Sequence, residues 1–149
     1  MSTAKELMTT DLISIDPNDS IEEAISLMLK HRVSGLPVVD ASGSLLGIIS
    51  EFDLLELVWD PKTTRDRVEH YMSNELQTVD QDDDLGAIAE KFQVLSIRRL
   101  PVMHEGRLVG ILSRHDLLRH IMQARGQFAP VVPRLLTPAD SHAQSPAGR

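Results

Sequence analysis

The stretch Gly47-Ile48-Ile49-Ser50-Glu51-Phe52-Asp53-Leu54-Leu55 decides the fold, because the chain contains it twice. Its second copy is Gly110-Ile111-Leu112-Ser113-Arg114-His115-Asp116-Leu117-Leu118, in which six of the nine residues are identical. An earlier pair, Met8-Thr9-Thr10-Asp11-Leu12-Ile13-Ser14-Ile15-Asp16 and Met72-Ser73-Asn74-Glu75-Leu76-Gln77-Thr78-Val79-Asp80, lies 64 positions apart. The spacing falls to 63 across a glycine-containing turn, where a change of length is well tolerated. The sequence therefore predicts an internal duplication.

Each copy has the pattern of a β-α-β-β-α unit. The first copy predicts a strand over 12–15, a helix, strands over 36–39 and 45–49, and a second helix from Ser50 through Val58. Ser20 and Glu23 have the spacing of a capping box at the start of the first helix. Its apolar face is expected to contain Ile21, Ala24, Ile25, Met28 and Leu29. In the second copy Asp84 is the expected cap, and the last helix reaches about Ala124.

The predicted fold class is α/β (α+β), with two tandem β-α-β-β-α repeats packed sheet to sheet about a pseudo-twofold axis. A unit of about 50 residues with a small sheet cannot bury enough apolar surface alone, so the two copies are expected to share one core. The expected divisions are repeat 1 over 4–58, a connector over 59–67, repeat 2 over 68–124 and a proline-rich flexible tail over 125–149. A short helix through Val68 and Tyr71 is expected to follow the connector.

Composition excludes several classes of function. The net charge of −7 disfavours nucleic acids and anionic membranes, and the 3% of aromatic residues disfavour a base-stacking surface. Cysteine is absent, which excludes thiolate chemistry and disulfides. No apolar run is long enough for a membrane span, and the first residues do not resemble a signal peptide. We therefore expect a cytoplasmic protein of a prokaryotic cell, with no membrane or nucleic-acid partner.

The repeated motifs closely resemble a pair of CBS domains, the Bateman module named after cystathionine β-synthase. The resemblance rests on four features present in both copies and covers about residues 4–124. They are the Met-Thr or Met-Ser lead, the strand Ser14-Ile15-Asp16 or Thr78-Val79-Asp80, the segment Gly35-Leu36-Pro37-Val38 or Arg99-Leu100-Pro101-Val102, and the Gly-x-x-Ser-x-x-Asp motif. It implies a stand-alone sensor of AMP, ADP or ATP, with S-adenosylmethionine or NAD as further possibilities. Such modules regulate an enzyme, channel or transporter and need no cofactor.

The Ser-x-x-Asp motifs allow two interpretations. Ser50 with Asp53, and Ser113 with Asp116, have the spacing of plain capping boxes at helix starts. The resemblance implies in addition that each aspartate accepts the hydroxyl groups of a ribose. A helix start also offers free N–H groups to a phosphate.

The resemblance implies two clefts, each formed by both copies. The first is expected to combine Thr9, Ser14, Val33, Gly35 and Pro37 with Arg99, Ser113, Arg114, His115 and Asp116. A second, weaker site is expected to combine Ser73, Thr78, Ile97 and Pro101 with Ser50 and Asp53. Backbone amides near Ser14 and Gly35 would read the adenine edge.

The charges near each expected site predict which of the two binds a phosphate-bearing ligand more tightly. Arg114 and His115 flank the first, and arginine suits phosphate through bidentate hydrogen bonds. Glu51 flanks the second and would repel phosphate. Arg99 replaces the glycine of the first copy and is expected to narrow or fill the second pocket. With Arg98 it is also expected to reach toward the shared centre.

Other motifs favour structure over chemistry. His115 and His120 are five residues apart and do not share a helix face, and residues 82–84 are explained as a helix cap, so no metal is expected. No motif for a nucleophile and its base is present, so we do not expect an enzyme. The second helices carry apolar residues that predict a homodimer: Leu54, Leu55, Val58, Leu117, Leu118, Ile121 and Met122. The alternative function is a ligand-free CBS scaffold for dimerisation or protein interaction. The regulated protein is unknown.

Overall fold

The computed structural model describes residues 2–124 and 132–136. The first half contains α1 (Ala4–Leu7), α2 (Ile21–His31), β1 (Gly35–Val39), β2 (Leu45–Ser50), α3 (Glu51–Leu54) and the 3-10 helix η1 (Leu55–Val58). The connection contains the 3-10 helices η2 (Pro61–Arg65) and η3 (Val68–His70). The second half contains β3 (Val79–Asp80), α4 (Leu85–Leu95), β4 (Arg99–His104), β5 (Arg107–Ser113) and α5 (Arg114–Ala124). Most of the predicted tail lies outside the described residues, and residues 132–136 form no helix or strand.

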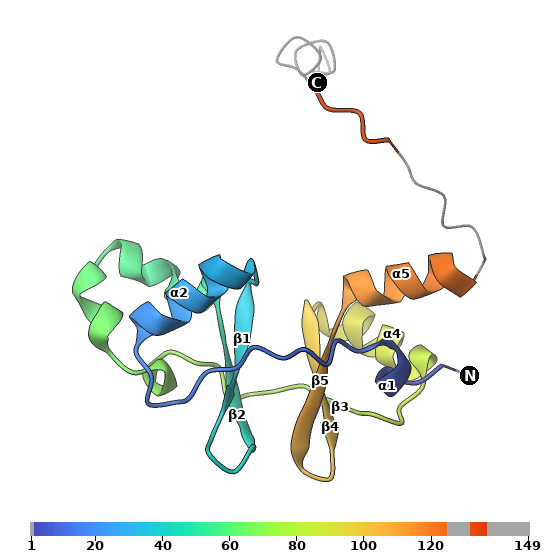
Figure 1. The fold of residues 1–149 in the computed structure, drawn as a ribbon, viewed down its shortest axis with the longest axis horizontal. Coiled ribbons are helices and arrows are strands. Elements are labelled where there is room, and N and C mark those ends of the chain that lie inside the picture. The colour runs from blue at the N-terminus through green and yellow to red at the C-terminus, as the bar shows by residue number, and fades with distance from the viewer. Residues whose placement is uncertain (1, 125–131, 137–149) are drawn as a thin grey trace.

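Two β-hairpins stand next to each other at the centre of the molecule (Figure 1). β1 pairs antiparallel with β2, and β4 with β5, and both hairpins have a register shift at equivalent positions, after Val38 and after Val102. β3 adds to β4 in parallel, with Val79 opposite Val102. In the first half the predicted strand over 12–15 is reduced to a single bridge between Ile15 and Val38. The mixed fold of two equivalent repeats is thus as the sequence predicts.

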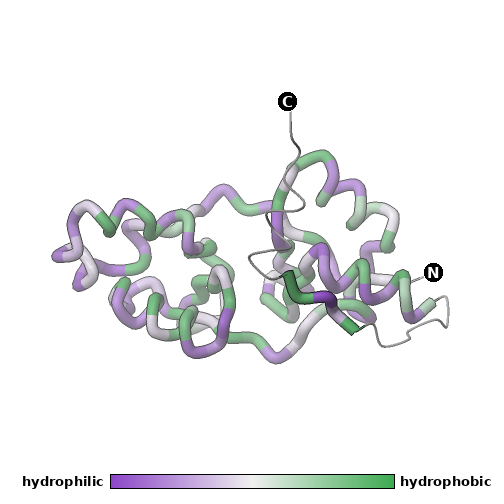
Figure 2. Tube along the Cα trace, turned by 90° about the horizontal axis from the view of Figure 1, so that it is seen from above, coloured by the Kyte–Doolittle hydropathy of each residue, from purple (hydrophilic) through white to green (hydrophobic). Residues whose placement is uncertain are grey.

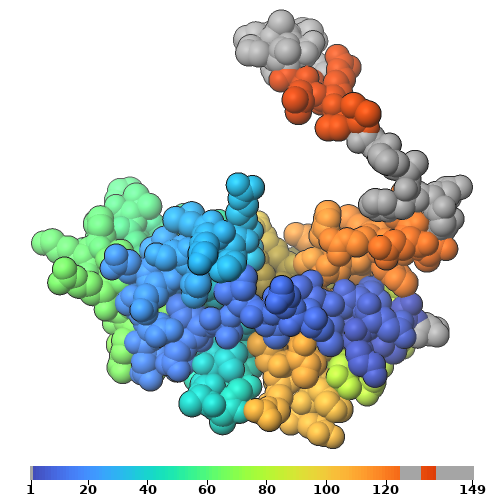
Figure 3. All heavy atoms as spheres, viewed as in Figure 1, coloured from blue at the N-terminus to red at the C-terminus, as the bar shows by residue number. Residues whose placement is uncertain are grey.

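The first segment of each repeat crosses to the other half. Thr9 and Ile111 exchange backbone N–H···O hydrogen bonds of 2.9 and 3.0 Å. Ser73 and Ile48 are the equivalent pair and exchange two bonds of 2.9 Å. Figure 2 shows the two crossings on opposite sides of the molecule, and Figure 3 shows the dark-blue N-terminal segment running across both halves. The halves are therefore interlaced and not only packed together.

The repeated glycines explain how these crossings fit. A Cβ atom built on Gly47 would lie 2.7 Å from both Met72 Sδ and the carbonyl oxygen of Ser73. A Cβ on Gly110 would collide with the side chain of Met8. Each glycine thus leaves the space through which the crossing segment of the other repeat passes. This close approach gives a physical reason for a glycine in both copies of the motif.

The buried side chains form two clusters, so the prediction of one shared core is wrong. One cluster lies in the first half around Ile21, Leu36 and Ile49, and the other lies in the second half around Ile88 and Leu100. Crossing segments complete both clusters, because Val68 joins the first and Ala4 joins the second. The residues brought in from the other repeat supply apolar surface that a single repeat lacks.

The apolar face of α2 is narrower than predicted. Ile21, Ala24 and Met28 are buried and Ile25 packs against the first cluster, but Leu29 is 74% exposed. The capping box of Ser20 and Glu23 is present as predicted, and Asp84 caps α4 through its bond from the N–H of Ala87. Leu29 instead faces a surface groove on the outside of the first half, described below.

The two second helices differ in length. α5 runs unbroken to Ala124 as predicted, whereas its counterpart is α helix only over Glu51–Leu54 and continues as the 3-10 helix Leu55–Val58. Pro61 follows shortly after and cannot continue an α helix. In a 3-10 helix residues three apart share a face, which agrees with the burial of both Leu54 and Leu57. Among the described helices, none combines the length and apolar character needed to cross a membrane.

Candidate functional site

Both Ser-x-x-Asp motifs form capping boxes. Asp53 Oδ2 accepts hydrogen bonds from the backbone N–H of Ser50 at 2.8 Å and from its hydroxyl at 2.9 Å. Asp116 Oδ2 accepts the same two bonds from Ser113 at 2.8 and 3.0 Å. The serine hydroxyl in turn accepts the N–H of the aspartate. In each box one carboxylate oxygen holds the helix start, and only Oδ1 remains for other partners.

The two remaining oxygens differ. Asp116 is 8% exposed, and its Oδ1 accepts a hydrogen bond of 3.0 Å from Arg119 Nη1. Among the described residues, Asp53 Oδ1 has no such partner, because position 56 of the first copy, equivalent to 119, holds a glutamate. The side chain of Asp53 is also only half-buried. The oxygen of Asp53 is therefore the more accessible acceptor.

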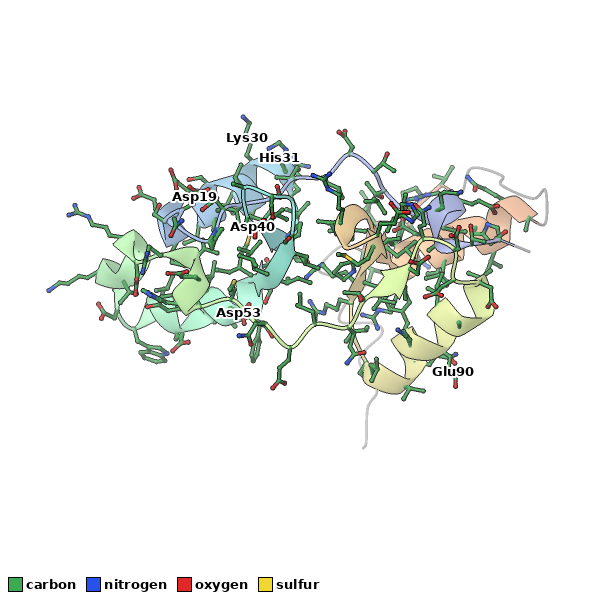
Figure 4. The ribbon with its side chains drawn as sticks, turned by 90° about the horizontal axis from the view of Figure 1, so that it is seen from below. Asp19, Lys30, His31, Asp40, Asp53 and Glu90 are labelled. Carbon is green, nitrogen blue, oxygen red and sulfur yellow. The ribbon has the colours of Figure 1, made fainter. Side chains whose placement is uncertain are left out.

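A pocket of about 640 Å³ adjoins Asp53. Figure 4 shows Asp53 on the side where a segment of the chain passes between the halves. This volume lies in the usual range for small-molecule sites. Both repeats contribute, as the sequence predicts for each cleft. Four residues expected at the second site line it, Ser50, Asp53, Ser73 and Ile97, whereas Thr78 and Pro101 do not. The other lining residues are Ser34, Ile48, Glu51, Phe52, Leu55, Glu75, Leu76, Gln77, Arg98 and Arg99.

A second pocket, of about 370 Å³, adjoins Asp116. Seven of the residues expected at the first site line it: Thr9, Val33, Gly35, Pro37, Arg99, Ser113 and Asp116. Ser14, Arg114 and His115 are not among its lining residues, and the last two are exposed on the first turn of α5. The larger pocket thus lies at the site that was expected to be the weaker one.

The two pockets are related by the internal repeat. Residues 9 and 11–13 line the pocket at Asp116, and residues 73 and 75–77, at 64 positions further on, line the pocket at Asp53. The same offset relates 33–35 to 97–99. Several lining residues of the two pockets were not predicted from the sequence: Asp11, Leu12, Ile13, Arg32, Glu75, Leu76 and Gln77. The offset of 64 relates 11–13 only to 75–77 and so could not have revealed them, but both segments lie between positions already expected at the sites, 9 and 14 in the first copy and 73 and 78 in the second.

Arg99 lies where the pockets meet and lines both. Its guanidinium donates a hydrogen bond to the hydroxyl of Ser34, which also lines both pockets. A Cβ on Gly35 would lie 2.6 Å from Arg99 Nη1, so the glycine provides the space that the guanidinium occupies. Burial lowers the pKa of Arg99 below its ordinary value, Arg98 adds to this, and Glu51 opposes it. Arg99 does not fill the pocket at Asp53, although it forms part of its wall.

Fold and site together define a class: a duplicated α+β module with two clefts between its halves, each placed at a capped helix start. The CBS domain model matches residues 4–60 and 68–123, and the chain therefore belongs to the CBS domain family.

The similar proteins are CBS-domain proteins in their turn. The chain is 35% identical over 118 residues to the CBS domain-containing protein YhcV of Bacillus subtilis, covering 78% of this chain and 84% of that protein. The structure of CBSX2 in complex with AMP matches with a TM-score of 0.77 and 31% identity, over 84% of this chain and 99% of the other. The CBS domain pair of MJ0100, in complex with 5′-methylthioadenosine and S-adenosyl-L-methionine, matches with a TM-score of 0.73 and 29% identity, over 83% and 98%. The chain spans only 23–41% of some longer relatives.

Proposed function

We propose that the chain is a regulatory module that binds an adenosine-containing ligand of the AMP class in the clefts between its two repeats, and that it has no catalytic role. Two similar structures support this ligand class, since CBSX2 was solved with AMP and MJ0100 with two adenosine derivatives. The pocket at Asp53 has a suitable volume of about 640 Å³.

Asp53 Oδ1 is the observation that carries the proposal. It is the remaining oxygen of a carboxylate already fixed by the cap, and a fixed acceptor suits the paired hydroxyls of a ribose. Arg98 and Arg99 line the same pocket and supply positive charge for a phosphate. Leu76 and Ile97 offer aliphatic surface for a base in a chain with few aromatic residues.

The pocket at Asp116 is proposed as the weaker of the two, which reverses the order expected from the sequence. Its carboxylate already accepts Arg119, so a ribose has to compete with an existing charged hydrogen bond. Its volume is also smaller, at about 370 Å³. Glu51 and Glu75 also line the larger pocket and lower its positive potential, but Arg98 and Arg99 remain available to a phosphate placed next to them.

Calorimetry with AMP tests this proposal. Asp53→Ala should weaken the tighter binding event by about 10- to 100-fold, as expected for loss of a hydrogen bond between a charged group and its ligand. Asp116→Ala is the matched control, because it removes an equivalent cap and should leave the tighter event in place. Urea denaturation of both variants establishes that the fold survives. An unchanged affinity in folded Asp53→Ala would refute the assignment, and the absence of AMP binding to the wild type would refute the ligand class.

The alternative function, a ligand-free scaffold, is favoured by exposed apolar surface. Leu55 and Val58 on η1 are exposed, as are the equivalent Leu118 and Ile121 on α5, whereas Leu54 and Leu117 face the cores. A groove of about 530 Å³ on the first half adds Ile25, Met28, Leu29 and Val33 to this surface. We propose that the chain forms a homodimer through these faces, since exposed apolar patches mark interaction sites.

Ligand binding and dimerisation are coupled in this proposal, because the pocket at Asp53 and the apolar groove share lining residues. Ser34, Glu51 and Leu55 line both the pocket at Asp53 and the apolar groove. A ligand that orders these residues would alter the docking face, which gives occupancy a route to a partner. Light scattering with and without AMP tests both parts. We expect the wild type to be a dimer and the Leu118→Glu variant to be a monomer. A wild-type monomer at micromolar concentration would refute the proposed assembly.

A further inference from the structure

We propose that Arg99 is shared between the two pockets and makes them antagonistic, so that a phosphate-bearing ligand in one pocket weakens binding of the same ligand in the other. This inference rests on the proposed function. It concerns a residue that breaks the internal symmetry, since the equivalent position in the first repeat is Gly35.

Arg99 is placed to serve either pocket. It lines both, and its guanidinium is held at their junction by a hydrogen bond to Ser34. The guanidinium lies directly against Gly35, since a Cβ atom built on this glycine would come within 2.6 Å of Arg99 Nη1. From this position, a change in the side-chain torsion angles of Arg99 would bring the guanidinium closer to one pocket and take it further from the other.

The charge of Arg99 is offset only in part by the protein, through Glu51. Among the described residues it belongs to no ion pair within 4.0 Å, although the chain as a whole has a net charge of −7. The residue is half-buried, and burial disfavours an uncompensated cation. The Arg98 side chain next to it is exposed and lines only the pocket at Asp53. An anion entering either pocket would thus gain by drawing this guanidinium toward it.

A guanidinium that moves toward a phosphate in one pocket cannot at the same time move toward a phosphate in the other. The first phosphate draws Arg99 away from the second pocket and adds a negative charge close to that pocket. Each pocket keeps a second arginine, Arg98 at Asp53 and Arg32 at Asp116, so the withdrawal of Arg99 weakens binding of the second phosphate without abolishing it. If both repeats carried arginine at this position, neither pocket would have to share it, and the antagonism would vanish.

A mutant cycle with AMP as the probe measures the antagonism. In the wild type, the weaker binding constant from calorimetry reports the pocket at Asp116 while the other pocket is filled. Asp53→Ala weakens binding at the tighter pocket, so that AMP can occupy the pocket at Asp116 while the other is empty, and affinity at Asp116 should then rise at least about fivefold, the lower end of typical coupling between sites. In an Arg99→Gly background, which restores the symmetry of the repeats, Asp53→Ala should leave that affinity unchanged. Arg99→Gln, of similar length but uncharged, should behave in the same way and serves if the glycine variant is unstable.

The outcomes separate this inference from the function on which it rests. If AMP binds but Asp53→Ala produces no gain at Asp116, or the same gain persists without Arg99, the sharing of Arg99 is refuted. If adenosine shows the same antagonism as AMP, phosphate is not its cause and the inference fails. Wild-type protein that binds no AMP at all would refute the proposed function itself.

Discussion

Gly47→Ala tests whether the crossing segments hold the two halves together. The added methyl group would lie 2.7 Å from both Met72 Sδ and the Ser73 carbonyl oxygen. Ser73 cannot yield without straining its two 2.9 Å backbone hydrogen bonds to Ile48. Overpacking costs about 1–3 kcal/mol, and each weakened hydrogen bond adds up to about 1 kcal/mol. Alanine restricts the unfolded chain and recovers about 0.4–1 kcal/mol. We expect the free energy of unfolding to fall by about 2–4 kcal/mol.

Urea denaturation followed by circular dichroism measures this change, because the midpoint moves while the slope stays constant if only stability changes. Gly86→Ala is the matched control. It makes the same substitution inside α4, where the new methyl group meets only Asp84 Oδ1 at 3.2 Å, and helix propensity favours alanine by up to about 1 kcal/mol. Gly110→Ala should fall between them, because only the flexible Met8 side chain has to move. Equal stability of the Gly47 and Gly86 variants would contradict the role assigned to the crossing.

Three further predictions concern charge. Arg98→Ala should weaken AMP binding by roughly tenfold and leave adenosine binding unchanged, whereas Arg114→Ala, outside both pockets, should alter neither in calorimetry. Arg119→Ala releases the cap carboxylate of α5 and should strengthen adenosine binding at the smaller pocket, so an unchanged or lower affinity there would count against the competition inferred here. The pKa of Asp40 is lowered from 3.8, first by the Ser42 hydroxyl, so its stabilising effect is present above that value and lost as pH falls through the folded pKa. Acid denaturation of Asp40→Ala should accordingly lack this contribution, and an acid transition identical to the wild type would disprove it.

The local elements of the fold could be predicted because local patterns determine them. Ser20 with Glu23 specifies a capping box within four residues, and the alternation of the hairpins needs no distant partner. The resemblance to CBS-domain pairs also implied that each cleft would draw on both copies, and residues of both copies line each pocket. Periodicity could not tell that Leu29 would be exposed, because a helical stripe fixes which residues share a face but not how much of that face is covered.

The missed features depend on contacts between distant residues. The crossing that pairs Thr9 with Ile111 leaves no mark on local propensity, and without it one shared core is the simplest way to bury two small sheets. The ranking of the pockets failed to anticipate their sizes for a similar reason. Arg114 and His115 occupy the two variable positions of the motif but are exposed and line neither pocket, whereas Arg98 lines the larger pocket from the residue before β4. The bond from Arg119 to Asp116 was detectable as an i, i+3 pair of opposite charges on a helix.

The interlaced crossings also govern the order in which the chain can fold. Thr9 finds its partner at Ile111, and Ala4 is covered by residues that follow position 78, so the start of the chain waits for nearly all of the described part to be synthesised. Closing so long a loop is entropically costly, and topologies rich in distant contacts fold slowly. During translation the first half therefore emerges with its own leading segment undocked and with Val68 still missing from its core. Two separately made halves could regain both crossings only if each half bound the first segment of the other. A pair of identical single repeats would have had this same arrangement before a duplication joined them.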